Sequence, residues 1–268
     1  MDVLFGDSVI LTENTNSGLL KSYCQFLGNI LKGNFGTSLI TGDKVTTLIS
    51  SHFYPTFALA LISFTILTLI FIPLSIVLGK HNKKSCDIYI TLSMSLPSFL
   101  LAFILIVLFV LLIPIFPLAG YKSIKAGLGV HLRYLMLPSI TLAITYSGLL
   151  ISIVFKKVRE LTIEPPYLYA KARGLKESTL NVKYLFLPTL SVILSVLSQA
   201  FISLLSGVAI VETIFNIPGL GSLLVTSVSR RDIPTATTLV LFITVICIVV
   251  NFITDIALEI INGGRENA

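Results

Sequence analysis

The sequence predicts an all-α protein that crosses a membrane several times, and three observations support that prediction. Of the 268 residues, 54% are hydrophobic and only 12% are charged, whereas a soluble domain carries roughly 25% charged residues. The mean hydropathy is +0.95. Most of the charges lie in loops between apolar runs, which favours a lipid bilayer over nucleic acid as the partner of this chain, despite its net charge of +6.

Five uncharged runs are long enough to cross the hydrocarbon core of a bilayer, which requires about 20 apolar residues in a helix. They cover residues 53–79, 88–121, 134–155, 184–211 and 233–254. We expect Pro114 and Pro117 to end the second helix and to leave 118–130 as a loop. Backbone polar groups find no water inside a bilayer, so each run is expected to be helical. The prediction is a polytopic protein with five transmembrane helices.

The distribution of Lys and Arg predicts the orientation of these helices. Ten of the nineteen lie in residues 80–87 and 156–183, whereas 122–133 and 212–232 hold three and two. An excess of Lys and Arg marks cytoplasmic loops. We therefore place the segment 1–52 outside and the tail 263–268 in the cytoplasm. Between them lies a transmembrane domain, 53–262, with a cytoplasmic loop at 156–183 and an outer loop at 211–235.

The segment 1–52 contains no basic stretch followed by an apolar signal run. Export of so long a tail without a signal is unusual, and we therefore expect that an N-terminal span is missing from this chain. The alternative is that residues 1–12 are the remainder of such a span or part of an ordinary exported tail.

Two of the predicted helices carry small and hydroxylated residues on one face. The face in the run 134–155 spans about 60° and the face in the run 184–211 spans about 140°, at 100° per residue. Such residues allow membrane helices to pack closely, and they also suit the wall of a polar pathway, so both interpretations stay open. The candidate pathway residues are Thr141, Thr145, Ser152, Ser191, Ser195, Ser198, Gln199 and Ser203.

No catalytic chemistry is visible in the sequence. The three cysteines and three histidines are scattered without metal-ligand spacing, and no GxSxG, HExxH or GxxxxGK[ST] motif occurs. We therefore predict a chain without enzymatic activity, metal or cofactor of its own. If nucleotide powers transport, ATP and Mg²⁺ must bind to another subunit. Ionisable groups within the runs are scarce, which disfavours an ion-coupled carrier.

The basic stretch at 156–183 is too long for a simple turn. Pro165 and Pro166 allow a helix to begin there, and Gly174 can end it in a left-handed cap. The result is a short helix across the cytoplasmic mouth of the protein. A solvated basic loop is the alternative, and the excess of cytoplasmic Lys and Arg alone would explain it.

The spacing YxxAxAxGL, followed by Leu-Pro, resembles the EAA loop of permease subunits of bacterial ABC importers. The residues that carry this resemblance are Tyr167, Ala170, Ala172, Gly174, Leu175, Leu187 and Pro188. In that family the loop forms a coupling helix that docks into a groove on the ATPase. Leu168 stands where the sugar importers have an acid, so the charged contact to the ATPase is either absent or comes from Lys171, Arg173 or Glu177. The resemblance implies these docking residues: Tyr167, Tyr169, Ala170, Lys171, Ala172, Arg173, Gly174, Leu175 and Glu177.

The resemblance is more specific to the permeases of dipeptide, oligopeptide and nickel importers. Three segments carry it: residues 26–45, 208–234 and 251–256. The outer-loop residues that carry it, and that are candidates for contact with a binding protein, are Glu212, Phe215, Pro218, Gly219, Gly221, Arg231 and Asp232. The resemblance implies a type I importer permease fold and import of peptides or of nickel and other metal-chelate complexes. It also implies a second, C-type permease, two ATPase subunits and an extracytoplasmic substrate-binding protein as partners.

Two departures from that family stand out: no membrane span precedes the external segment, and the chain ends in IINGGRENA instead of a Leu-Asp-Pro-Arg tail. In the outer loop, Pro218, Gly219 and Gly221 force turns between apolar residues. This pattern predicts either a re-entrant hairpin or a loop packed on its own helices. The alternative functions are an ion-coupled carrier or channel, and a truncated remnant that does not transport.

Overall fold

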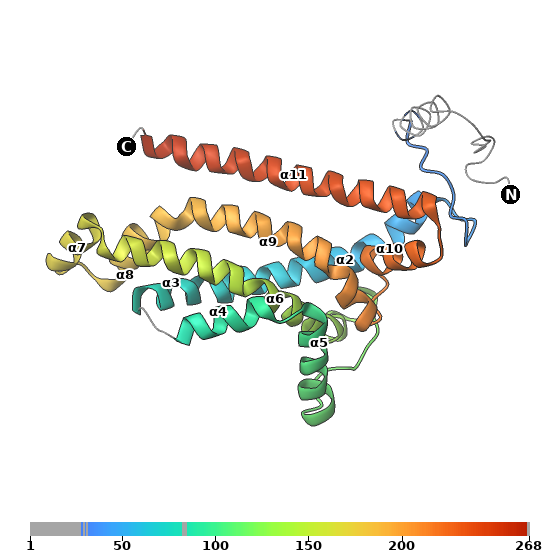
Figure 1. Ribbon diagram of the computed structural model, residues 1–268, viewed down its shortest axis with the longest axis horizontal. Helices are drawn as coiled ribbons and strands as arrows, with labels where there is room; N and C mark the ends of the chain where they lie inside the picture. Colours follow the sequence, from blue (N-terminus) through green and yellow to red (C-terminus); the bar gives the residue numbers. More distant parts are fainter. Residues whose placement is uncertain (1–27, 29, 31, 82–84, 267–268) are drawn as a thin grey trace.

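The computed structural model describes residues 28, 30, 32–81 and 85–266, and nearly all of them are helical. The long helices lie side by side in an elongated bundle (Figure 1). Among the described residues, β pairing is limited to an isolated antiparallel bridge between Thr37 and Lys44. The elements are α2 (Val45–Ile66), η1 (Leu67–Phe71), α3 (Ile72–His81), α4 (Ser85–Ser95), α5 (Ser98–Ile106), η2 (Val107–Leu112), η3 (Ile124–Ala126), α6 (Leu128–Ile163), α7 (Pro165–Ala172), α8 (Glu177–Thr179), η4 (Leu180–Phe186), α9 (Leu187–Ile214), α10 (Leu220–Ser229) and α11 (Ile233–Glu266).

Within the described residues, four helical segments are each long and apolar enough to cross a membrane. They are Val45–Lys80, Leu128–Ile163, Glu177–Ile214 and Ile233–Ile261. The prediction of an all-α polytopic protein is confirmed. The helices extend beyond the predicted runs, since α2 begins before residue 53 and α11 continues through most of the expected tail 263–268. The predictions about residues 1–12 and a preceding span lie outside the described residues.

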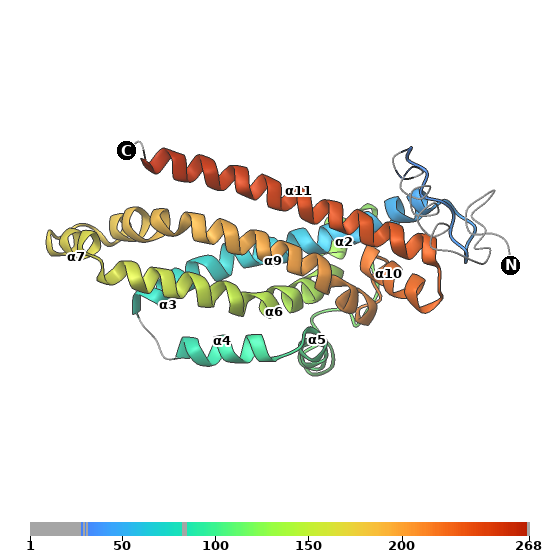
Figure 2. The same cartoon turned by 45° about the horizontal axis from the view of Figure 1, so that its top comes forward.

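The predicted second span is a bent pair of helices, and the five predicted spans are present if this pair counts as one of them. Helices Cys86–Ser95 and Ser98–Leu112 meet at 104°. The bend lies at Pro97, whose backbone is extended, with φ −60° and ψ 145°. Proline removes a helical N–H and disfavours helical geometry in the residue before it. As a result α5 projects sideways from the bundle (Figures 1 and 2).

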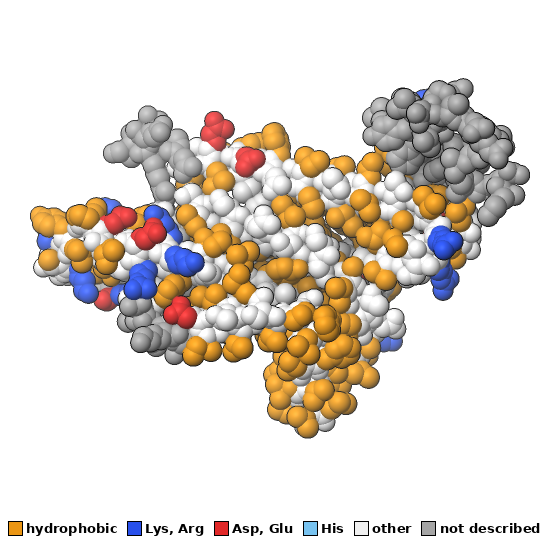
Figure 3. All heavy atoms as spheres, viewed as in Figure 1, with side chains coloured by type: hydrophobic (Ala, Val, Ile, Leu, Met, Phe, Trp, Pro, Cys, Tyr) orange, Lys and Arg blue, Asp and Glu red, His pale blue; other side chains and the backbone are white. Residues whose placement is uncertain are grey.

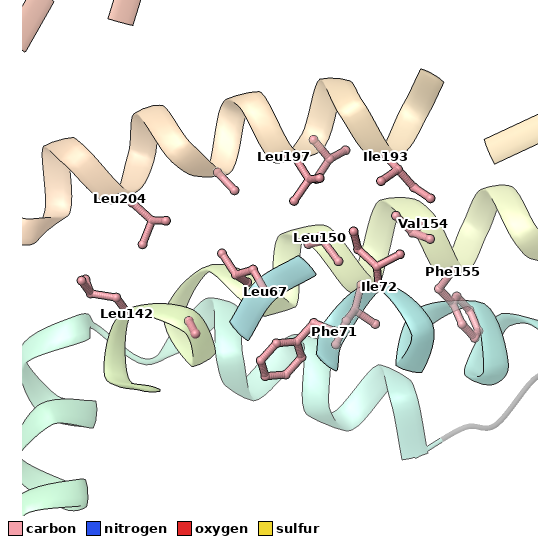
Figure 4. Close-up of a cluster of buried hydrophobic side chains, with 14 of the residues drawn as sticks. Leu67, Phe71, Ile72, Leu142, Leu150, Val154, Phe155, Ile193, Leu197 and Leu204 are labelled. Carbon is pink, nitrogen blue, oxygen red and sulfur yellow. The ribbon is translucent and has the colours of Figure 1, made fainter. Parts of the chain in front are cut away.

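Helix α6 is the centre of the bundle. In its most apolar window 61% of the residues are buried, against 11% in α11. It packs against α2, α3, α4, α5 and α9. Side chains from three of the spans meet in the core (Figure 4): Leu67, Phe71, Ile72, Leu142, Leu150, Val154, Phe155, Ile193, Leu197 and Leu204.

The contact between α4 and α6 depends on a glycine. A Cβ added at Gly148 would lie 2.8 Å from Oγ and 2.9 Å from Cβ of Ser93. The Ser93 hydroxyl donates a hydrogen bond to the Ile144 carbonyl at 2.7 Å. One helical turn away from Ser93, the hydroxyls of Tyr89 and Ser147 are 2.6 Å apart. Gly148 therefore allows α4 and α6 to pack closely.

We predict that Gly148→Ala lowers stability whereas Gly129→Ala, in the same helix, does not. A Cβ at Gly129 would meet nothing within 4 Å. Alanine is normally favoured over glycine in a helix by roughly 1 kcal/mol, but overpacking costs about 1–3 kcal/mol. The measurement is thermal unfolding of both purified variants in detergent. Equal midpoints for the two variants would contradict the proposed packing.

Candidate functional site

The two ends of the bundle differ in charge. Lys and Arg side chains gather around α7 and α8, whereas hydrophobic side chains cover much of the middle of the bundle and α5 (Figure 3). We call the end that carries α7 the α7 end and the opposite end, which carries α10, the α10 end. The candidate residues fall at these two ends and along the spans that connect them.

Local sequence explains why α7 starts and stops where it does. Two prolines occupy its first positions, where a missing N–H costs nothing. At its end, Gly174 has φ +74°. The N–H of Gly174 donates to the Lys171 carbonyl at 3.0 Å, and the N–H of Leu175 donates to the Ala170 carbonyl at 3.3 Å. This pair of bonds is a Schellman motif. The predicted helix and its glycine cap are confirmed.

One face of α7 holds the helix on the bundle. Tyr167 and Ala170 are only 4% and 2% exposed, and both belong to the main hydrophobic core. Burial raises the pKa of the Tyr167 phenol. Because these two side chains are buried, they do not contact a partner directly in this structure. Their role is to hold α7 in position on the bundle.

The opposite face of α7 is open and mixes apolar, aromatic and basic groups. Leu168 is 51% exposed and Tyr169 is 66% exposed. The Arg173 guanidinium lies 5.6 Å from the centre of the Tyr169 ring, a cation–π distance. The other exposed members of the predicted docking set here are Lys171, Ala172, Gly174 and Leu175. An exposed apolar and aromatic surface rimmed by cations is typical of a protein contact.

Glu177 is engaged within the chain. Its carboxylate forms an ion pair with Lys80 at the end of α3. The Lys80 ammonium also donates to Oδ1 of Asn181 at 3.3 Å. Of the three charged residues considered for a partner contact, Lys171 and Arg173 are therefore the ones without an ion pair among the described residues.

The polar face of α9 is divided between two environments. Ser198 is buried and donates to Oδ1 of Asn251 in α11 at 3.4 Å. By contrast Ser195 and Gln199 are exposed, and Ser195 donates to the Ser191 carbonyl at 3.0 Å. Ser198 therefore joins two helices, while Ser195 and Gln199 present a polar surface on an apolar span.

Half-buried Ser203 lies at the contact between α6 and α9. Its carbonyl accepts a hydrogen bond from the Tyr146 hydroxyl at 2.7 Å.

In α6, the candidate pathway residues lie at or near helix contacts. Thr141 is fully buried, and its hydroxyl donates to the Leu137 carbonyl at 2.9 Å. Thr145 donates to the Thr141 carbonyl at 2.8 Å and, like Ser152, is half-buried. The pathway interpretation fails for Thr141 in this conformation, because its side chain is enclosed by the bundle.

At the α10 end, a buried carboxylate caps a helix. Glu212 is 0% exposed. One carboxylate oxygen accepts from the Thr56 hydroxyl at 2.6 Å, and the other accepts from the Ser222 N–H at 2.8 Å. The Thr56 oxygen in turn accepts from the Leu220 N–H at 2.7 Å. Helix N-termini carry unpaired N–H groups and a partial positive charge, so Glu212 and Thr56 stabilise the start of α10.

Two glycines permit this capping arrangement. A Cβ at Gly219 would overlap the Glu212 carboxylate, and a Cβ at Gly221 would lie 2.5 Å from Cα of Ala209. The sequence suggested that these glycines form turns, and the structure shows that they allow close approach of α10 to α9. Phe215 is also buried, and its carbonyl accepts from the Gly120 N–H at 2.7 Å. The loop packs on its own helices, as one of the two interpretations predicted.

Asp232 ties a second segment to the α10 end. It is 1% exposed and accepts hydrogen bonds from the Ser38 hydroxyl at 2.6 Å and the Leu39 N–H at 3.2 Å. It also accepts from the Thr235 N–H at 3.4 Å, in the first turn of α11. The neighbouring Arg231 is exposed and has φ +59°.

These contacts change the interpretation of the outer-loop residues. Pro218 and Arg231 are exposed and available to a partner. The side chains of Glu212, Phe215 and Asp232 are buried, as are Gly219 and Gly221, so in this structure they offer no exposed surface to a binding protein. They hold the loop in position instead.

Thr56, Ser38 and Lys80 are the functional candidates that the sequence alone did not indicate. Thr56 follows Pro55 in an otherwise apolar stretch, and an isolated hydroxyl there is a weak signal of a buried contact. Its partner lies 156 residues away in the sequence.

Comparison with known proteins identifies the family. Residues 72–266 match the model described as "Binding-protein-dependent transport system inner membrane component". The chain belongs to this family. The matched range includes α7, the α9 face and the outer loop, and so contains every candidate residue predicted from the sequence. The resemblance to ABC importer permeases is confirmed, and the protein is a multi-pass membrane transport subunit.

The similarity to individual permeases covers nearly the whole chain. It is 30% identical over 258 residues to the metal-staphylopine import system permease protein CntB of Staphylococcus aureus, covering 94% of this chain and 80% of that protein. It is 28% identical over 253 residues to the oligopeptide transport system permease protein OppB of Haemophilus influenzae, covering 92% and 80%. A probable peptide ABC transporter permease of Sinorhizobium fredii is 26% identical over 251 residues, covering 92% and 80%.

A crystal structure of an amino acid ABC transporter with histidines has a similar fold. The TM-score is 0.55 at 19% identity, covering 80% of this chain and 94% of the solved one. At that identity the likeness concerns the fold alone, and it agrees with the predicted importer permease fold.

We predict that Thr56→Val destabilises the protein and that Thr56→Ser does so much less. Valine keeps the shape but leaves the Leu220 N–H and one Glu212 oxygen without their partner, and each unpaired buried group costs about 1–3 kcal/mol. Thermal unfolding in detergent measures the effect. If the two variants unfold at the same temperature, the hydrogen bonds of Thr56 do not stabilise the α10 end.

Proposed function

We propose that this chain is a permease subunit of an ATP-driven importer and that α7 is the helix through which an ATPase subunit moves it. The observation that carries the proposal is the two-sided character of α7. Tyr167 and Ala170 anchor it in the core, while Leu168, Tyr169 and Arg173 face outward. A rigidly held helix with an open apolar and basic face suits docking to another protein.

The proposed orientation puts the α7 end in the cytoplasm and the α10 end outside. The excess of Lys and Arg in residues 156–183 supports it. In this arrangement two ATPase subunits bind ATP and Mg²⁺ in the cytoplasm, and a second, C-type permease lies beside this one in the bilayer. The chain itself performs no bond chemistry.

The connections of α7 explain how its displacement would move the spans. Glu164 alone separates α6 from α7, and residues 173–176 separate α7 from α8. Such short links transmit a rigid-body shift of α7 to the span Leu128–Ile163 and to the span Glu177–Ile214. Closure of the ATPase pair on ATP would thereby switch the permease between inward-facing and outward-facing states.

The exposed polar face of α9 is the candidate wall of the pathway. Ser195 and Gln199 lie on an apolar span, where a polar surface facing lipid is unfavourable. We place this face toward the second permease, with the cargo passing between the two subunits. Peptides or metal-chelate complexes, including those of nickel, are the proposed cargo, because permeases for peptides and for metal-staphylopine are among the relatives.

At the outer end, Pro218 and Arg231 are the proposed contacts for a substrate-binding protein. Both are exposed. Glu212 and Asp232 keep the loop that carries them in place through their internal hydrogen bonds.

We predict that Arg173→Glu weakens binding of the ATPase and lowers ATP hydrolysis at least about tenfold, whereas Arg159→Glu does not. A tenfold loss corresponds to about 1.4 kcal/mol, which a charge-assisted contact can supply. Both residues are exposed at the α7 end, but only Arg173 adjoins the open face of α7. Co-purification and ATP turnover of the assembled importer are the measurements. Unchanged binding in Arg173→Glu, or equal losses in both variants, would count against docking through this face.

A further inference from the structure

Two segments flank α7: the end of α6, which we call the entering arm, and α8, which we call the leaving arm. The last turn of α3 contacts both arms. On the side of α6, Gly79 is pressed against the entering arm: an added Cβ would lie 2.9 Å from Cβ of Val158 and 3.0 Å from the Phe155 carbonyl oxygen. On the side of α8, Lys80 forms its ion pair with Glu177 in the leaving arm. Two consecutive residues of α3 therefore contact the two segments that flank α7, α6 before it and α8 after it.

The Lys80 side chain is held in a defined position. It is only 17% exposed, whereas the Glu177 side chain is 67% exposed. Its ammonium also lies 3.3 Å from Oδ1 of Asn181, one helical turn beyond Glu177. Two acceptors on successive turns of one segment fix the lysine along the start of the span Glu177–Ile214.

This contact joins segments that are far apart in the sequence. Lys80 and Glu177 are 97 residues apart, and they belong to different spans. The same two spans are joined again at the α10 end, where the Thr56 hydroxyl donates to Glu212 at 2.6 Å. The span Val45–Lys80 is thus fastened to the span Glu177–Ile214 at two separate places, Thr56 and Lys80.

We propose that Lys80 is a positioning residue for transport, which couples the first span to movements of α7. When α7 is displaced, the ion pair with Glu177 carries the α3 end along with the leaving arm. The first span then conveys the movement toward Thr56 and the outer loop. This inference rests on the proposed function of α7 as the docking helix. It adds a second mechanical connection, through side chains, to the connection along the backbone.

The contrasting explanation is an ordinary surface ion pair, which contributes little to any property of the protein. The two explanations differ in what they predict for coupling. An incidental pair leaves the ratio of cargo transported to ATP hydrolysed unchanged when it is broken. In the Lys80 variants, a coupling contact lowers that ratio while ATPase docking stays normal, because the predicted docking residues, including Leu168, Tyr169 and Arg173, remain intact.

A charge-swap experiment on the complete importer in proteoliposomes tests the proposal. The variants are Lys80→Glu, Glu177→Lys and the double exchange, with Lys157→Glu, Glu160→Lys and their double exchange as the matched control. Lys157 and Glu160 also form an ion pair at this end, at 3.2 Å, but both lie in α6 and join no second span. Bound ATPase, ATP turnover and cargo uptake are measured for each variant.

We expect each single change at Lys80 or Glu177 to lower uptake per ATP about tenfold and the double exchange to restore most of it, since residues in contact show strong non-additivity. The control set should stay near the wild-type ratio. An unchanged ratio in the single variants, or a double exchange as defective as they are, would overturn the role of Lys80. If a charge reversal prevents assembly, Lys80→Met and Glu177→Gln test the same contact with smaller changes.

The outcome is separable from that of the proposed function. Arg173→Glu without effect on ATPase binding would refute docking through α7. Normal docking with an unchanged transport ratio in the Lys80 variants would refute only the further inference.

Discussion

A bilayer leaves no water for polar groups to bind, and this constraint determines much of the structure. The buried carboxylates of Glu212 and Asp232 are each surrounded by hydroxyl and backbone N–H donors. Their partners come from α2, from α10 and from the segment before α2, so satisfying these groups also fastens distant parts of the chain together. These hydrogen bonds and the close packing at Gly219 and Gly221 together hold the α10 end of the bundle in one position.

The α7 end is built differently. Its helix is defined by local sequence, with prolines at the start and a glycine cap at the end. Its attachment depends on the buried Tyr167 and Ala170 and on the pair between Lys80 and Glu177. The spans between the two ends are packed around α6, with close contacts at Gly148 and Gly79. A bundle of this kind can pass a displacement from one end to the other as movements of whole helices.

The sequence predicted those features that depend on neighbouring residues. The apolar runs indicated the helices, and the Ala-x-Ala-x-Gly-Leu spacing indicated α7 and its cap. It did not predict the bend at Pro97, because the apolar run continues through that proline without interruption. Nor did it predict Thr56 as a partner of Glu212 or Ser38 as a partner of Asp232, since these residues lie 156 and 194 positions away. The division of the α9 face into Ser198 and the exposed Ser195 depends on where α11 packs, which no local pattern encodes.

The most direct test of the account is cysteine cross-linking between α7 and the ATPase in the assembled importer. The three native cysteines, Cys24, Cys86 and Cys247, are first replaced. A single cysteine is then placed at Leu168, which is exposed, or at Ala170, which is buried on the same helix. We expect Leu168→Cys to form a cross-link with the ATPase and Ala170→Cys to form little or none. Absence of a cross-link from Leu168→Cys in an importer that still hydrolyses ATP would contradict docking through the open face of α7.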